Sequence, residues 1–209
     1  MASPPVFQDE SVMTFFDRTF LSLAFLLSSQ AALAQLQPCV AGAPGTRETV
    51  SIKNASFDEV GPPSGIRDWQ TIEHVHPGHY VFERETQQPH SPPVSAKMKR
   101  VGDEDFGSLQ QTFVIKSCWV GKKAVLSGFL RSQDVTEVGG ALVLQANGGG
   151  GDILSWNHMN ENKVRGTTPW TKHSIEIPIP PNTYVLRFGY MLEGPGALWA
   201  DDLKLEIVY

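Results

Sequence analysis

The sequence predicts an all-β fold, a β-sandwich, on three observations. Short runs rich in β-branched and aromatic residues alternate with turn residues along most of the chain. Several of these runs alternate apolar and polar side chains with a period of two; Leu203, Leu205 and Ile207, for example, are separated by charged residues. After residue 34, no segment sustains the apolar stripe of an amphipathic helix. One sandwich from about residue 48 to the C-terminus follows.

The expected strands lie between residue 49 and the C-terminus, each bounded by turn signals. They are residues 49–53, 80–84, 95–100, 109–115, 124–131, 141–145, 153–156, 171–177, 184–192 and 198–208. Residues 147–152 contain four consecutive glycines, which accept positive φ angles at little steric cost, and they predict a hairpin tip. Pro178, Pro180 and Pro181 exclude a helix before the penultimate strand.

The first 34 residues have the features of a secretory signal peptide. Residues 20–27 form an apolar run too short for a bilayer, which needs about 20 residues. Ala32, Leu33 and Ala34 then give a small-x-small cleavage signature. We expect cleavage before Gln35, with Met13 as an alternative start, and a buried N-terminal helix as the alternative interpretation. Residues 35–47 would form a flexible arm and residues 48–209 the sandwich, in the periplasm or outside the cell.

Composition and motif searches exclude several classes of function. The chain has 209 residues, 17 Lys and Arg against 22 Asp and Glu, and a formal charge of −5. This weak acidity argues against a nucleic-acid partner and against an anionic membrane surface. The sequence contains no Gly-x-Ser-x-Gly elbow, no His-Glu-x-x-His pair and no phosphate-binding loop. We therefore expect a protein that is not an enzyme and requires no cofactor.

Several motifs of the second half resemble a known domain type. They are residues 126–132, 156–159, 166–170, 188–196 and 199–203, with 54–58 as a weaker opening motif. Together they are similar to the galactose-binding-like jelly-roll domain related to carbohydrate-binding modules. The version they resemble is the accessory domain found beside secreted erythromycin-esterase-like proteins and tail-specific peptidases. The resemblance covers about residues 54–208 and implies a jelly-roll fold and a binding role. It places Trp170 and Trp199 in the framework, where we expect them in the core.

Aromatic and amide side chains supply the candidate ligand-binding residues. Sugar-binding sandwiches stack a pyranose ring on Trp or Tyr while neighbouring polar groups bind its hydroxyls. Polar residues gather around one tryptophan in the set Trp156, Asn157, His158, Asn160 and Asn162. Trp69 and Tyr80 are further aromatic candidates, although large aromatic residues commonly belong to the core.

Two metal sites are conceivable. The resemblance implies a structural Ca²⁺ held by oxygen ligands, for which Asp58, Asp201 and Asp202 are candidates; exposed strand-end carboxylates are the alternative. His74, His76 and His79 flank a Pro-Gly turn and could bind a transition metal, or they could be ordinary loop histidines.

The sequence contains two cysteines, Cys39 and Cys118. In an oxidising compartment they could form a disulfide that ties the N-terminal arm to the sandwich. One buried and one exposed thiol is the alternative.

These observations predict a secreted, non-enzymatic module that binds carbohydrate or another cell-envelope ligand. A protein-protein interaction domain without a small ligand is the first alternative. A metal-handling protein that uses His74, His76 and His79 is the second.

Overall fold

The computed structural model describes residues 39–62 and 65–209 and confirms the all-β prediction. The strands are β1 (Arg47–Val50), β2 (Val60–Gly61), β3 (Gly65–Ile66), β4 (Gln70–Glu73), β5 (Tyr80–Glu85), β6 (Ser95–Arg100), β7 (Phe106–Val114), β8 (Lys123–Gly148), β9 (Ile153–Asn157), β10 (Val164–Pro178), β11 (Thr183–Glu193) and β12 (Ala197–Val208). A 3-10 turn, η2 (Ser117–Trp119), precedes β8. No helix among these residues is long and apolar enough to cross a membrane. The predicted signal peptide lies outside the described residues.

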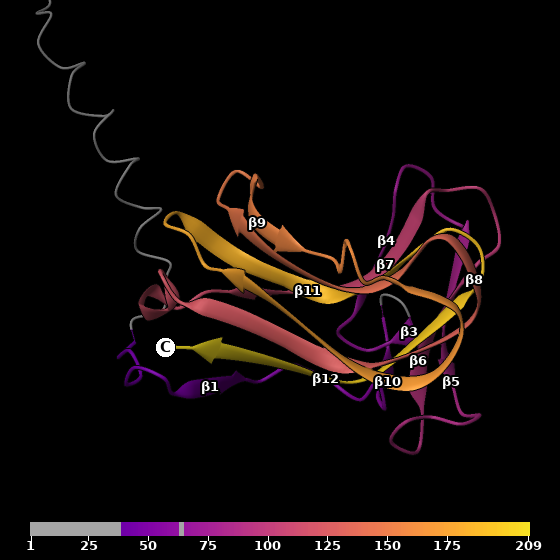
Figure 1. The fold of residues 1–209 in the computed structure, drawn as a ribbon, viewed down its shortest axis with the longest axis horizontal. Coiled ribbons are helices and arrows are strands. Elements are labelled where there is room, and N and C mark those ends of the chain that lie inside the picture. Colours follow the sequence, from indigo (N-terminus) through magenta and orange to yellow (C-terminus); the bar gives the residue numbers. More distant parts are fainter. Residues whose placement is uncertain (1–38, 63–64) are drawn as a thin grey trace, which may run out of the picture. The chain divides into compact units, whose positions relative to one another are not determined.

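Ten of the strands form one continuous sheet that folds into two layers, as in a jelly roll. The first layer contains β5, β6, β12, the first half of β8 and β10, with β1 paired to the end of β12. The second contains β4, β7, β11, the second half of β8 and β9. Figure 1 shows β1 and β12 together on one side of the sandwich and β9 and β11 on the other. The short β2–β3 hairpin stands apart from this sheet.

Strand β8 connects the two layers. The sequence predicted two separate strands here, at 124–131 and 141–145, because the residues between them are polar and end in Gly139-Gly140. The structure instead has one strand of 26 residues. Positive φ angles at Asp134, Glu137 and Gly139 bend it, and its pairing with β10 shifts register three times. Such irregularities increase strand twist, which lets one strand pass from one layer to the other.

The core fills the space between the layers. Leu126 and Leu130 contribute from the first half of β8, and Phe188 and Tyr190 from β11; all four are at most 1% exposed. In β12 the inward residues change parity at Asp201–Asp202, where the pairing with β8 also shifts and Asp202 adopts a φ of 50°. The two aspartates therefore lie at the break between two runs of inward residues, one ending at Ala200 and the next beginning at Leu203.

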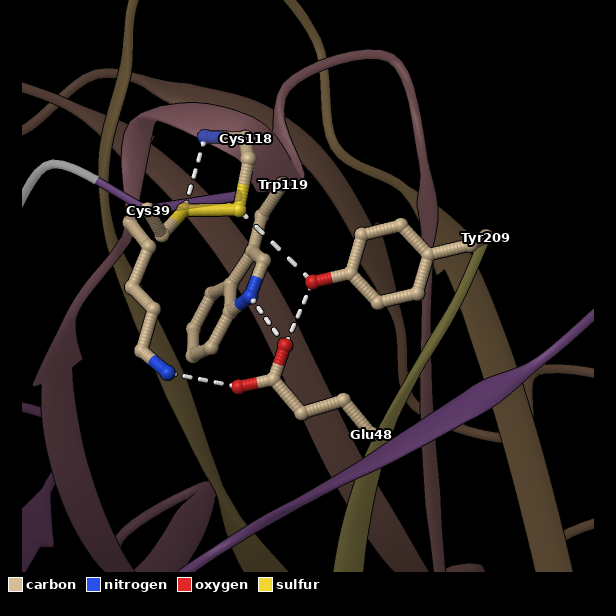
Figure 2. Close-up of a disulfide and its surroundings, with 6 residues drawn as sticks. Cys39, Glu48, Cys118, Trp119 and Tyr209 are labelled. Atoms are coloured by element: carbon tan, nitrogen blue, oxygen red, sulfur yellow. Dashed lines mark hydrogen bonds and ion pairs between the residues drawn. A yellow bond between two sulfur atoms is a disulfide. The ribbon is translucent and has the colours of Figure 1, made fainter. Parts of the chain in front are cut away.

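The predicted disulfide between Cys39 and Cys118 is present, with a Cα–Cα distance of 5.7 Å. Beside it, Glu48 of β1 accepts hydrogen bonds from the Trp119 indole (3.0 Å), the Lys116 ammonium group (2.6 Å) and the Tyr209 hydroxyl (Figure 2). Partial burial acts to raise the pKa of Glu48, but these three donors together lower it below its ordinary value. The network therefore joins the N-terminal arm, β1 and the C-terminal residue.

Candidate functional site

The outward side of the second layer carries a half-exposed tryptophan at its edge. Trp156 of β9 pairs with Gln145 of β8, which pairs with Arg187 of β11, which in turn pairs with Thr112 of β7. Because neighbouring residues in register point to the same side of a sheet, these four side chains form a row across the layer. Trp156 is 49% exposed. We call this surface the Trp156 face.

A cavity lies beside Trp156 on this face, above a row of short or buried side chains. The adjacent row consists of Val143, Gly189 and Gln110, and Val143 and Gln110 are buried although they point outward. Gly189 has no side chain, and a Cβ atom there would lie 2.0 Å from the Leu109 carbonyl oxygen, so only glycine fits. The result is a cavity of about 210 Å³ whose wall includes the Trp156 indole.

Titratable side chains line one end of this cavity. His158 stacks on Trp156 with ring centroids 3.9 Å apart, and its Nδ1 is buried without a hydrogen-bond partner among the described residues. Burial and the nearby Lys163 ammonium group lower the pKa of His158. Lys163 forms a largely buried ion pair with Glu193, and burial lowers the pKa of Lys163 to about 8. The stacked imidazole therefore favours its neutral form.

A second hollow, of about 590 Å³, lies on the other side of Trp156. Asn157, Asn160 and Asn162 line it together with residues 172–175 of β10. The structure thus gathers the predicted group around Trp156. The Asn157 amide is engaged within the loop, because it donates to the Glu176 carbonyl and accepts from the Met159 amide. Asn160 and Asn162 are exposed beside the indole.

Two of the predicted ligand-binding residues, Trp69 and Tyr80, are buried, so the prediction that they bind a ligand is wrong. Trp69 is completely buried, packs on Phe57 with centroids 4.9 Å apart, and donates from Nε1 to the Asn54 carbonyl. Tyr80 is 4% exposed, and its hydroxyl donates to the carbonyls of residues 104 and 105. Both rings complete the core, so neither can stack on a ligand.

Two of the three candidate histidines, His74 and His76, contact the same carboxylate, Glu104, and His79 contacts a different one. The Nδ1 atom of His76 lies 2.8 Å from Glu104, that of His79 lies 2.8 Å from Asp103, and that of His74 lies 3.2 Å from an exposed aspartate. Within residues 39–62 and 65–209, the groups whose ligand atoms lie within 4.8 Å of one another do not include these histidines. His74 and His76 therefore share Glu104, but the three imidazoles do not form a compact set of metal ligands.

Asp201 and Asp202 gather with His90 rather than with Asp58. His90 Nδ1 lies 2.7 Å from Asp202, and the Ser91 amide donates to Asp201. Asp58 instead accepts from the Ser56 hydroxyl. Calcium takes six to eight oxygen ligands, whereas an imidazole and protein hydrogen bonds engage these carboxylates. Calcium binding stays a prediction that this arrangement does not favour.

Sequence reasoning missed a groove on the outward side of the first layer. Glu83, Lys97, Trp199 and Arg131 occur in register on β5, β6, β12 and β8 and form a row. The Arg131 guanidinium lies 4.1 Å from the Trp199 ring centroid and the Lys97 ammonium 5.5 Å from it. Lys97, Trp199 and Arg131 of this row line a groove of about 790 Å³, which we call the Arg131 groove.

The expectation that Trp170 and Trp199 are core residues is wrong for Trp170, whereas Trp199 is buried as expected. Trp170 is partly exposed and donates from Nε1 to the Gln88 carbonyl, 2.9 Å away. Trp199 is buried, but under Arg131 on the outward side. The alternation of side chains along this strand indicates the outward position of Trp199, because Leu198 and Ala200 face the core and the residue between them must face outward.

Together the two layers and the long strand β8 that joins them define the fold class, which is a jelly-roll β-sandwich. A xylan-binding CBM22-1 domain from Paenibacillus barcinonensis Xyn10C is 14% identical and superposes with a TM-score of 0.54 over 81% of this chain and 97% of that domain. The Stig cyclase Fisc from Fischerella sp. TAU gives 0.55 at 13% identity, over 78% and 98%. Tailspike protein 4 of bacteriophage CBA120 gives 0.58 at 12% identity, over 76% and 21%.

By sequence, the chain matches an uncharacterized HTH-type transcriptional regulator, YbfP, from Bacillus subtilis (strain 168). The two are 27% identical over 136 residues, which is 64% of this chain and 45% of the regulator. The match thus spans less than half of that protein. The chain matches no family model.

Proposed function

We propose that this domain is a secreted, non-enzymatic module that binds carbohydrate on the Trp156 face. The observation that carries the proposal is the half-exposed Trp156 indole, which stands between two hollows of about 210 and 590 Å³. A flat exposed ring matches the apolar C–H side of a pyranose, and hollows beside it leave space for the neighbouring sugar units. A likeness of fold to a xylan-binding domain is consistent with this ligand class.

Polar side chains near the ring suit the hydroxyl groups of a sugar. Gln145 and Arg187 follow Trp156 in the cross-strand row, and Gln110 lies in the adjacent row. Their planar amide and guanidinium groups offer donors and acceptors with fixed geometry. An oligosaccharide stacked on Trp156 would extend along this row, across β8 and β11.

The disulfide supports the secretory part of the proposal. Disulfides form and persist in oxidising compartments and are rare in the cytosol of most organisms. The bond between Cys39 and Cys118 therefore agrees with the predicted signal peptide.

A Trp156→Ala substitution tests the binding site. We expect the tag-free protein to retain neutral glycans on an array, and the variant to bind the best of them at least tenfold more weakly by calorimetry. Trp170→Ala is the matched control, because Trp170 is a partly exposed tryptophan on the other layer, and it should leave the affinity unchanged. Equal affinity of Trp156→Ala and the wild type would contradict the proposal, as would an array on which no glycan is retained.

A further inference from the structure

The Arg131 groove lies on the outward side of the first layer, away from the strands that carry the Trp156 face, and the proposed function does not use it. We propose that this groove is a second binding site, which takes a carboxylate-bearing sugar of an acidic polysaccharide with Arg131 as the residue that binds the carboxylate. The inference does not rest on binding at Trp156.

Arg131 is a cation without a carboxylate partner. In the part of the chain that the structure describes, no carboxylate oxygen lies within 4.0 Å of its guanidinium, whereas the neighbouring Lys97 is 2.7 Å from Glu83 and 3.6 Å from Glu85. Arg131 Nη1 donates to the Gln88 side-chain oxygen at 3.0 Å, and the group stacks on Trp199. Partial burial lowers the pKa of Arg131, and the charge of Glu85, which makes no ion pair with it, partly offsets this shift. The guanidinium is thus held in place and partly desolvated, and it keeps N–H donors that can bind a ligand.

A second donor on the same floor has no acceptor. The Nε1 atom of Trp199 is buried without a hydrogen-bond partner among the described residues, in a side chain that is only 4% exposed. Buried polar groups are normally satisfied, so this indole N–H is a donor with which the acceptor of a bound ligand can pair. A carboxylate offers two such oxygens, and its geometry matches the fork of a guanidinium.

The walls of the groove favour a sugar over an acidic peptide. Amides and hydroxyls line them at Gln87, Gln133 and Thr167, and the volume of about 790 Å³ lies within the range of ligand clefts. Glu85 and Asp134 also line the groove; they can accept hydrogen bonds from hydroxyls but would repel a second negative charge. The site therefore fits a single carboxylate flanked by neutral, hydroxyl-rich rings.

The test compares two probes that differ at one carbon: glucuronic acid linked to xylotriose, and the same tetrasaccharide after reduction of its carboxyl to a primary alcohol. Both are titrated into the Trp156→Ala variant, so that binding at the Trp156 face does not contribute. We expect the acid to bind at least tenfold more tightly than the reduced form. Arg131→Gln should abolish this preference, and Arg131→Lys, which keeps the charge but not the fork, should weaken binding of the acid at least threefold.

Arg67→Gln is the matched control, because it removes the same charge from an exposed arginine that lines neither the Arg131 groove nor the hollows beside Trp156. It should leave the preference intact. In the wild type, the indole N–H resonance of Trp199 should shift on adding the acid, which reports the site even if an Arg131 variant fails to fold. The inference would be overturned if the two probes bound equally or if the preference for the acid survived Arg131→Gln. It would also be overturned if hexaglutamate bound as tightly as the acid, or if the Trp199 resonance did not shift. Failure of the proposed function is separate, because it is measured with neutral glycans and Trp156.

Discussion

The Trp156 face and the Arg131 groove lie on the two outward sides of one sandwich, and each contains a row of side chains in register across several strands. They differ in the position of the aromatic ring. Trp156 is at the edge of its layer and 49% exposed, whereas Trp199 is at the centre of its row and 4% exposed beneath Arg131. The face of an exposed ring can stack on a ligand, whereas the face of the covered Trp199 ring is occupied by the cation above it.

This difference teaches that a tryptophan on the outward side of a sheet has two distinct uses. On the Trp156 face, apolar and amide side chains share the floor, and the indole is available to a sugar ring. In the Arg131 groove, the floor is polar and the indole holds a guanidinium at a fixed height by a cation–π contact. Three predictions on stability, in order of decreasing size, separate structural from binding effects at these surfaces.

The largest expected loss lies outside both surfaces. Opening the disulfide by a Cys39→Ser, Cys118→Ser double substitution frees a loop with a sequence separation of 79 residues. The chain-entropy estimate for such a loop is about 4 kcal/mol. We expect this loss in the free energy of unfolding by urea titration, with ligand affinities of the folded double variant unchanged. A change in affinity at either surface would show that the disulfide also shapes the sites.

Removing each tryptophan should sharpen the contrast between the covered and the exposed ring. Trp199→Ala deletes a buried aromatic side chain and should cost about 3 kcal/mol. Trp156→Ala deletes a half-exposed one and should cost less than about 1 kcal/mol. Urea denaturation of both variants at neutral pH measures the difference. Equal losses would mean that the two rings are equally important for packing.

A further effect, smaller than that of Trp199→Ala, concerns a carboxyl group on the first layer. Burial, together with the charge of Asp202, raises the pKa of Asp201 from 3.8 to about 6. Because the folded state favours the protonated form, the carboxylate lowers stability above pH 6, and this penalty disappears as the pH falls towards 3.8. The stability difference between wild type and Asp201→Asn should therefore change by about 2 kcal/mol between pH 4 and pH 7.5.

Thermal unfolding of the two proteins across this pH range provides the measurement. Asp134→Asn is the control, since Asp134 is an exposed carboxylate at the Arg131 groove, and asparagine accepts its positive φ of 51°. Parallel pH profiles for wild type and Asp201→Asn would contradict the expected burial of this charge.

Much of the fold was predictable because strand alternation is a local property. Most of the predicted strands occur within a few residues of their expected bounds, and the tip at 147–152 connects β8 to β9 as expected. The short strands β2, β3 and β4 were missed, since two to four residues are too few to show a period. The prediction of two strands at 124–131 and 141–145 in place of β8 was wrong, because the polar residues at the bend of β8 resemble those of a turn.

The candidate sites were predictable only in part. Trp156 and its amide neighbours are adjacent in the chain, so the turn after β9 gathers them without help from the rest of the fold. Trp69 and Tyr80 have the same residue chemistry, yet packing against distant strands buries them. Arg131, Lys97 and Trp199 come from three strands far apart in the sequence, and only their pairing creates the groove.

The sequence by itself therefore determined the all-β class, the positions of most strands and the local group around Trp156, because these depend on neighbouring residues. The tertiary structure decided which aromatic rings are exposed, which strand joins the two layers, and which distant charges meet across the first layer. The physical reason is that alternation assigns each residue to one side of its strand, whereas burial and charge pairing depend on which strands lie beside it.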